Sequence, residues 1–179
     1  VVFVVSLSSL EEFVNAYGFI PAQFSILTIF TSMFLHGGIA HIFGNMWFLY
    51  IFGDNVEDSF GHLKYFIFYI LPGISASMLH FLLNIGSSVP AVGASGAISG
   101  ILGAYVVLFP HVGIYVTGAF GHVGKVSAKF MIGVWFLFQL LSGTISLFGY
   151  QSGIAFFAHI GGFVFGAVIA FVYKFAAKK

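Results

Sequence analysis

The sequence predicts an all-α membrane protein, a single domain of residues 1–179 built as a bundle of six transmembrane helices. Composition is the first reason: 60% of the residues are hydrophobic, 20% are aromatic and only 6% are charged. Soluble domains carry about 25% charged residues, so this chain cannot cover itself with a water-facing surface. The second reason is a series of long apolar runs separated by glycine, proline and polar residues.

The apolar runs define the helices in order. The opening run, VVFVVSLSSL, has ten residues, whereas a membrane-spanning helix needs about 20, so we expect the front of a first helix to be missing before Val1. Residues 11–35 are expected to form a loop, and a second helix to end at Gly53-Asp54-Asn55. A weakly apolar loop is expected over 111–124, after Pro110. The five later helices are predicted at about 38–52, 63–83, 94–109, 126–148 and 154–175.

The six lysines orient these helices, since the chain contains no arginine. Cytoplasmic loops of membrane proteins are enriched in positive residues, so the 2–3 loop, the 4–5 loop and the C-terminus are predicted to be cytoplasmic. We therefore expect a multi-pass protein of a prokaryotic cell membrane with both termini in the cytoplasm. A net charge of +1 gives no indication of a nucleic-acid partner, and the absence of cysteine excludes disulfides and thiolate metal sites. The lysines are Lys64, Lys125, Lys129, Lys174, Lys178 and Lys179.

Four polar residues lie near the starts of helices two, four and six, which all begin at the outer face in this topology: His41, Asn45, Ser95 and His159. Polar residues within a membrane are costly and usually face the bundle interior or a wet cavity. From Ser95 to Phe109 the helix rises about 22 Å, less than the hydrocarbon core of about 30 Å. A helix that starts inside the membrane exposes free N–H groups, so we expect a recessed cavity that opens to the outer face.

Two interpretations of Ser95 remain open from the residues themselves. Small residues follow it on one helix face, at Gly96, Ser99, Gly100 and Gly103, and such faces commonly pack against a neighbouring helix. Alternatively, Ser95 is a nucleophile. The G-x-S-x-G elbow of soluble hydrolases does not apply here, because position 97 is alanine and no strand precedes the serine.

His159 is the candidate base for such a nucleophile. It is the one large residue on a narrow face of the last helix, with Ala155, Gly162, Gly166 and Ala170. If this face packs against the small face of helix four, Ser95 and His159 come within hydrogen-bonding reach and form a minimal activated nucleophile. A structural hydrogen bond is the alternative role. No helix core contains a carboxylate, so a hydrolase built on this pair is expected to use a dyad.

Donors for an oxyanion are also available. The backbone N–H of Ser95 lies at a helix start, and His41 and Asn45 share a face at i, i+4 spacing, although both are equally suited to interhelical hydrogen bonds. His80 is a rival base that we interpret as structural, and His36 is expected to support the site. Zinc binding by His36, His41 and His159 is disfavoured because HExxH spacing and a completing carboxylate are absent; no metal and no cofactor are expected.

Three short motifs, in this order, resemble those of the rhomboid intramembrane serine proteases from about residue 11 onward: HIFGN (41–45), GASG (93–96) and AHIGG (158–162). The resemblance implies that Ser95 is the nucleophile, that His159 is the general base, and that His41 and Asn45 line the oxyanion site. It also implies single-span transmembrane substrates, cut near the outer end of their helix in the lipid bilayer. Gly93, Gly96 and Gly162 belong to these motifs and are expected to support the site by close packing.

The chain departs from the family pattern at two places. Many members carry Trp-Arg in the first outer loop, where this chain has SILTIFTSMF, and some place an aromatic ring where Ser99 stands. Two other functions also stay open. A catalytically inactive rhomboid-like protein could bind membrane clients, although Ser95 and His159 are both present. A small transporter or metal-handling protein is disfavoured, because the helix cores lack the acids and lysines of an ion path.

Overall fold

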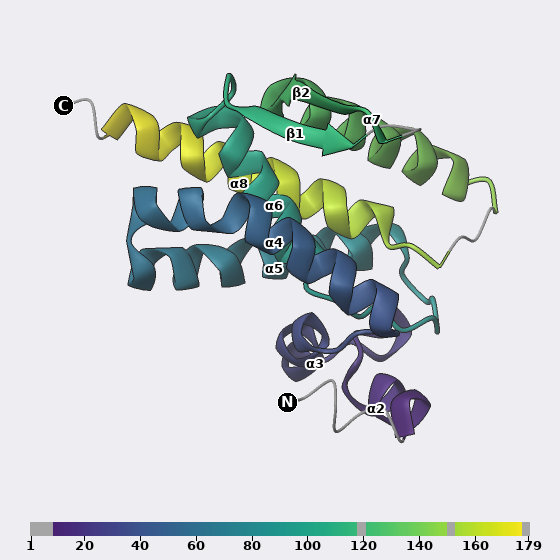
Figure 1. The fold of residues 1–179 in the computed structure, drawn as a ribbon. Coiled ribbons are helices and arrows are strands. Elements are labelled where there is room, and N and C mark those ends of the chain that lie inside the picture. The colour runs from purple at the N-terminus through teal and green to yellow at the C-terminus, as the bar shows by residue number, and fades with distance from the viewer. Residues whose placement is uncertain (1–8, 118–120, 150–152, 177–179) are drawn as a thin grey trace.

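A computed structural model of the chain describes residues 9–117, 121–149 and 153–176. In this part of the chain the structure is a helical bundle with one small β-hairpin (Figure 1). In chain order the elements are α2 (Leu10–Tyr17), η2 (Pro21–Gln23), α3 (Ile26–Thr31), η3 (Ser32–Phe34), α4 (Ile39–Phe60), α5 (His62–Leu83), α6 (Ser95–Leu108), β1 (Gly113–Thr117), β2 (Val123–Ser127), α7 (Ala128–Ser146) and α8 (Phe156–Ala176).

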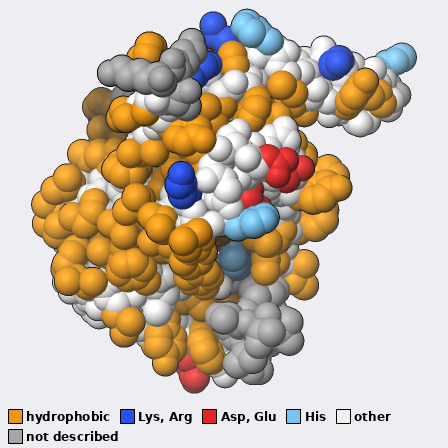
Figure 2. All heavy atoms as spheres, turned by 90° about the vertical axis from the view of Figure 1, so that its left-hand side faces the viewer, with side chains coloured by type: hydrophobic (Ala, Val, Ile, Leu, Met, Phe, Trp, Pro, Cys, Tyr) orange, Lys and Arg blue, Asp and Glu red, His pale blue; other side chains and the backbone are white. Residues whose placement is uncertain are grey.

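Three helices, α5, α7 and α8, are each long and apolar enough to cross a membrane. The segment Ile26–Phe34 and α4 qualify together as a fourth span, bent by 87° at the break between them. Large hydrophobic side chains cover much of the outer surface (Figure 2), as expected for a protein that contacts lipid. The chain is therefore an integral membrane protein. The first of the six predicted helices falls largely on residues 1–8, outside the described residues, so the count of six stays a prediction.

Helix α6 lies at the centre of the bundle. It has 14 residues, so it is about 21 Å long, and every residue from Gly96 to Tyr105 is buried. Helices α4, α5 and α8 pack around it (Figure 1). The helix has the short length expected from the sequence, and its start below the membrane surface stays a prediction.

Helices α6 and α8 touch through their backbones. A Cβ added to Gly162 would overlap the carbonyl oxygen of Gly96, and a Cβ added to Gly166 would overlap that of Gly100. One turn further along, a Cβ on Gly103 would meet the carbonyl oxygen of Phe163. The two small-residue faces predicted from the sequence therefore pack against each other, and glycine is needed wherever the helices are closest.

The predicted end of the second helix at Gly53-Asp54-Asn55 is wrong, because α4 continues to Phe60. Gly53 serves close packing here: a Cβ at this position would lie 2.7 Å from the Tyr65 hydroxyl on α5. The helix ends instead at Gly61, which adopts a positive φ of 77° and donates its N–H to the Glu57 carbonyl at 2.7 Å. With ψ at 153°, this backbone conformation is open essentially to glycine alone, so Gly61 ends the helix.

The all-helical prediction also needs correction over 111–124. Strands β1 and β2 form an antiparallel hairpin in which Gly113 pairs with Ser127 and Thr117 with Val123. The strands contain Ile114, Tyr115 and Val116, residue types that favour extended structure. A hairpin satisfies its own backbone hydrogen bonds along the paired edges, which makes it a suitable connection between α6 and α7.

The segment 11–35 is likewise not the loop that was expected, since it folds into the short helices α2, η2, α3 and η3.

At the end of the bundle opposite the segment 11–35, acidic, lysine and histidine side chains gather near the α4–α5 turn within an otherwise hydrophobic surface (Figure 2). There His62 contacts Glu57 at 2.7 Å. Asp54, Glu57, Asp58 and Lys64 thus lie around the α4–α5 turn, and the start of α6 lies at the other end of the bundle.

We predict that Gly166→Ala lowers the free energy of unfolding by about 1–3 kcal/mol, the usual cost of overpacking, because the added methyl group overlaps the Gly100 carbonyl. Gly133→Ala on α7 is the matched control, since a Cβ at Gly133 meets nothing within 4 Å. This control should be neutral or stabilising by up to about 1 kcal/mol. Thermal unfolding in detergent measures both, and equal stability of the two variants would contradict the close contact of α6 with α8.

Candidate active site

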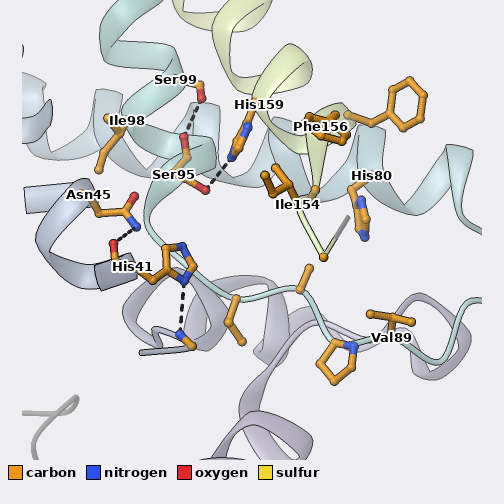
Figure 3. A pocket seen from close by; sticks show the side chains of 18 of the residues that line it. His41, Asn45, His80, Val89, Ser95, Ile98, Ser99, Ile154, Phe156 and His159 are labelled. Atoms are coloured by element: carbon orange, nitrogen blue, oxygen red, sulfur yellow. Dashed lines mark hydrogen bonds between the residues drawn. The ribbon is translucent and has the colours of Figure 1, made fainter. Parts of the chain in front are cut away.

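Ser95 and His159 meet at the start of α6 (Figure 3). The Ser95 Oγ lies 2.8 Å from the Nε2 of His159. Ser95 is the first residue of α6, and His159 lies in the first turn of α8. Gly96 directly follows the serine, and Gly162 follows the histidine by three residues, so one of the backbone contacts between the two helices lies beside the pair. This contact brings a hydroxyl and an imidazole from distant parts of the sequence into hydrogen-bonding distance.

The second ring nitrogen of His159 has a partner that the sequence analysis missed. Its Nδ1 lies 2.8 Å from the Oε1 of Gln139, a buried residue of α7. The Trp135 ring lies on the same helix, with its centroid 6.0 Å from that of the imidazole. These two residues provide the support that an aromatic ring at position 99 would otherwise give. The available signal was that Gln139 is the only amide side chain in an apolar helix.

His41 and Asn45 lie on α4 and line the same cavity as Ser95 (Figure 3). The Nδ1 of His41 accepts a hydrogen bond from the Gly37 N–H at 3.2 Å, so the proton of the neutral ring lies on Nε2. The Nδ2 of Asn45 donates to the His41 carbonyl at 2.9 Å. An amide nitrogen carries two hydrogens, so Asn45 keeps a second donor.

Gly93 separates His41 from Ser95. A Cβ at this position would lie 2.8 Å from the His41 Nε2 and 3.6 Å from the Ser95 Oγ. The backbone of Gly93 has a φ of +124°, a conformation that residues with a side chain rarely adopt. Both the space and the backbone therefore require glycine, and the His41 Nε2 and the Ser95 Oγ both lie beside this glycine.

The other residues singled out from the sequence take structural places. Ser99 donates its hydroxyl to the Ser95 carbonyl at 2.6 Å. His80 pairs with Asn84 on α5, with 3.3 Å between Nδ1 and Nδ2, although it also lines the cavity. His36 is buried, and its ring packs edge-on against His41 with centroids 5.3 Å apart. Within the described parts of the chain, no three His, Asp or Glu side chains are grouped as metal ligands.

A cavity of about 700 Å³ lies over the Ser95–His159 pair. Residues of α4, α5, α6, α7 and α8 line it, so every long helix of the bundle contributes to its wall. Its size falls in the range of protein ligand sites. Polar groups on its wall include His41, Asn45, His80, Ser95 and His159, and hydrophobic ones include Trp135, Ile154 and Phe156.

A family model of the rhomboid domain matches residues 23–174. The chain belongs to the rhomboid family. Among its relatives, RHOMBOID-like protein 1 of Arabidopsis thaliana is 31% identical over 146 residues, which are 81% of this chain and 34% of the relative. Rhomboid protease GluP of Bacillus subtilis is 40% identical over 82 residues, 45% of this chain and 16% of that protein.

Another rhomboid relative is named as inactive. Inactive RHOMBOID-like protein 8 of Arabidopsis thaliana is 31% identical over 140 residues, 78% of this chain and 36% of the relative. The chain spans about a third of the length of these plant relatives. Because the relatives come from a plant and a bacterium, the prokaryotic origin expected from the sequence stays a prediction.

We predict that a fluorophosphonate probe labels Ser95 in the detergent-solubilised protein, because the His159 Nε2 lies 2.8 Å from its hydroxyl oxygen, within reach of the hydroxyl proton. Ser99 should stay unlabelled, since its hydroxyl is bonded to the Ser95 carbonyl. His159→Ala should slow labelling by about 10²–10⁴-fold, the usual contribution of a general base. Peptide mass spectrometry locates the label, and a label on any other serine would refute the assignment of Ser95.

Proposed function

We propose that this rhomboid is an intramembrane serine endopeptidase that uses a Ser95–His159 dyad. The observation that carries the proposal is the 2.8 Å hydrogen bond between the Ser95 Oγ and the His159 Nε2, under a cavity of about 700 Å³. A hydroxyl is a weak nucleophile until a base accepts its proton. The partly buried pair supplies that base within the bundle, at the start of a helix shorter than the membrane is thick.

The reaction follows from this arrangement. Ser95 Oγ attacks the scissile carbonyl carbon while its proton passes to His159 Nε2, and a tetrahedral oxyanion forms. His159 then gives the proton to the leaving amine as the C–N bond breaks, which leaves an acyl ester on Ser95. Water attacks the ester with His159 again as base, so the acid product leaves and Ser95 regains its proton.

The oxyanion is proposed to bind at the Ser95 backbone N–H, the His41 Nε2–H and the second N–H of Asn45. The first turn of a helix has N–H groups without a partner in the helix, and the helix dipole favours negative charge there. His41 is supported as a donor because its Nε2 and the Ser95 Oγ lie beside the same residue, Gly93: a Cβ added there would be 2.8 Å from the first atom and 3.6 Å from the second. Because these donors are held before the substrate arrives, they stabilise the charge with little reorganisation.

The proposed substrates are single-span transmembrane proteins cut near the outer end of their helix, with the lipid bilayer as the medium. The lysines support this orientation. Lys174 Nζ donates to the Val107 carbonyl at 2.8 Å, and the Lys129 N–H donates to the Pro110 carbonyl, so both lie at the end of α6 opposite Ser95. With positive residues inside, Ser95 faces the outer half of the membrane, the termini are cytoplasmic, and a six-helix bundle surrounds an outward-facing cavity.

A rhomboid-like protein that binds membrane clients without cleaving them is the alternative. The relative named inactive is similar over most of this chain. Such similarity therefore does not by itself distinguish an active rhomboid from an inactive one, and the client-binding function stays an alternative. Cleavage is the property that distinguishes the two functions, because both predict binding of a transmembrane segment.

For the dyad, we predict that Ser95→Ala abolishes cleavage of a single-span substrate in proteoliposomes. His159→Ala should lower cleavage as much, since loss of one member of a coupled pair costs nearly as much as loss of both. His80→Ala should retain activity within about tenfold, the control for a histidine that lines the cavity without contacting Ser95. Gel electrophoresis of substrate and product measures all three. Substrate binding with no cleavage by the parent would instead favour the client-binding function.

For the oxyanion site, Asn45→Ala should lower kcat by about 10–10³-fold with little change in KM, because a donor that serves only the developing charge acts on the transition state. The upper figure is that of a single donor in a soluble protease, and the lower one allows His41 and the Ser95 N–H to compensate. Steady-state cleavage kinetics give both constants. A rise in KM at unchanged kcat would mean that Asn45 binds the substrate and not the oxyanion.

A further inference from the structure

Helix α7 contacts the rest of the bundle along one stripe, and Gln139 is the polar member of that stripe. The buried residues of α7 are Ala128, Ile132, Gln139 and Gly143, which recur at the spacing of a single helix face. Gln139 is 4% exposed. A buried amide is costly unless it is hydrogen-bonded, and the Gln139 Oε1 makes its bond to the His159 Nδ1 at 2.8 Å.

This bond determines where the imidazole proton lies. An amide oxygen can only accept a hydrogen bond, so the His159 Nδ1 must carry the proton and donate it. In the neutral ring the Nε2 then has a free lone pair, and it accepts the Ser95 hydroxyl proton across the 2.8 Å contact. The opposite tautomer would place a proton on Nε2, where it would block transfer from the serine.

We propose that Gln139 is a positioning residue that holds His159 in the one tautomer able to act as a base, a role that rests on the proposed serine protease function. It occupies the place that a carboxylate fills in a triad, and among the described residues no Asp or Glu lines the cavity over Ser95 and His159. A neutral acceptor fixes the tautomer without adding a buried negative charge, which is costly in a membrane.

Among the side chains around His159, Gln139 is the one that supplies an acceptor for the Nδ1 proton. The side chains that face the imidazole are Ser95 from α6, and Gln139 and Trp135 from α7. The titratable groups acting on it from other helices are His41 of α4 and His80 of α5. Trp135 approaches the imidazole ring to ring, whereas the amide oxygen of Gln139 lies 2.8 Å from Nδ1 and is the acceptor within hydrogen-bonding distance of it.

Two substitutions at one position test the proposal, with Thr144→Val on α7 as the control. Gln139→Leu keeps the volume and removes the acceptor, and kcat and kcat/KM should fall together by about 10–100-fold, as for partners that orient other functional histidines. Gln139→Glu keeps an acceptor oxygen and should retain activity within about tenfold of the parent. Thr144 is exposed and bonds only within its helix, so its variant should match the parent.

The pH profile separates positioning from mere packing. The base works when neutral, so activity is lost as the pH falls and the imidazole takes up a proton. A carboxylate at 139 stabilises the imidazolium, so the acid limb of the kcat/KM profile should move to higher pH in Gln139→Glu. In histidine ¹⁵N spectra of the parent, His159 should carry its proton on Nδ1, and Gln139→Leu should shift that proton toward Nε2.

The outcomes are distinct. Full or raised activity in folded Gln139→Leu, or a parent His159 with its proton on Nε2, would overturn the proposal. Equal losses in the Leu and Glu variants with an unmoved acid limb would also overturn it, because the role would then be structural. If the parent neither cleaves substrate nor labels at Ser95, the protease function fails, and the ¹⁵N spectra still decide whether Gln139 sets the tautomer.

Discussion

The contact between the backbones of α6 and α8 is the constraint on which the site depends. Gly162 and Gly166 of α8 let the two helices approach until their Cα atoms meet the carbonyl groups of Gly96 and Gly100, and Gly103 of α6 meets the Phe163 carbonyl in the same way. Within a membrane, helices associate mainly by close packing and interhelical hydrogen bonds, because lipid is as apolar as their side chains. Ser95 and His159 lie beside the contact of Gly162 with Gly96, so the same packing that joins the helices sets the distance between hydroxyl and imidazole.

The polar groups of the site form a connected set within this frame. Ser95, His159 and Gln139 make a chain of two 2.8 Å hydrogen bonds that joins α6, α8 and α7. On α4, His41 and Asn45 are held by hydrogen bonds within the helix and to the loop before it. Since unpaired polar groups are costly in an apolar interior, each bond both stabilises the fold and fixes a functional atom. The site is thereby organised before a substrate enters.

Sequence reasoning reached the parts of the structure that depend on spacing within one helix. The small faces of α6 and α8 follow from residue spacing alone, and packing these two helices together predicts that Ser95 and His159 meet. Sequence reasoning failed where the structure depends on contacts between helices or strands. Gln139 was missed because the rotation of α7 about its axis is set by packing. Gly53 was interpreted as a helix end because its contact with Tyr65 of the next helix, which leaves no space for a side chain, cannot be seen in the sequence. The hairpin and the short helices of 11–35 were missed because short segments carry weak periodic signals.

The most direct measurement of the central claim is the rate of fluorophosphonate labelling at Ser95 in Gly162→Val, with thermal unfolding recorded on the same detergent sample. The variant alters no atom that takes part in the chemistry, but its side chain overlaps the Gly96 carbonyl and must separate α6 from α8. A displacement of about 1 Å can cost about 10²-fold in rate, and a loss of that size in protein that remains folded is the result this account predicts. Labelling at the parent rate in folded Gly162→Val would show that the glycine contact does not set the distance between Ser95 and His159.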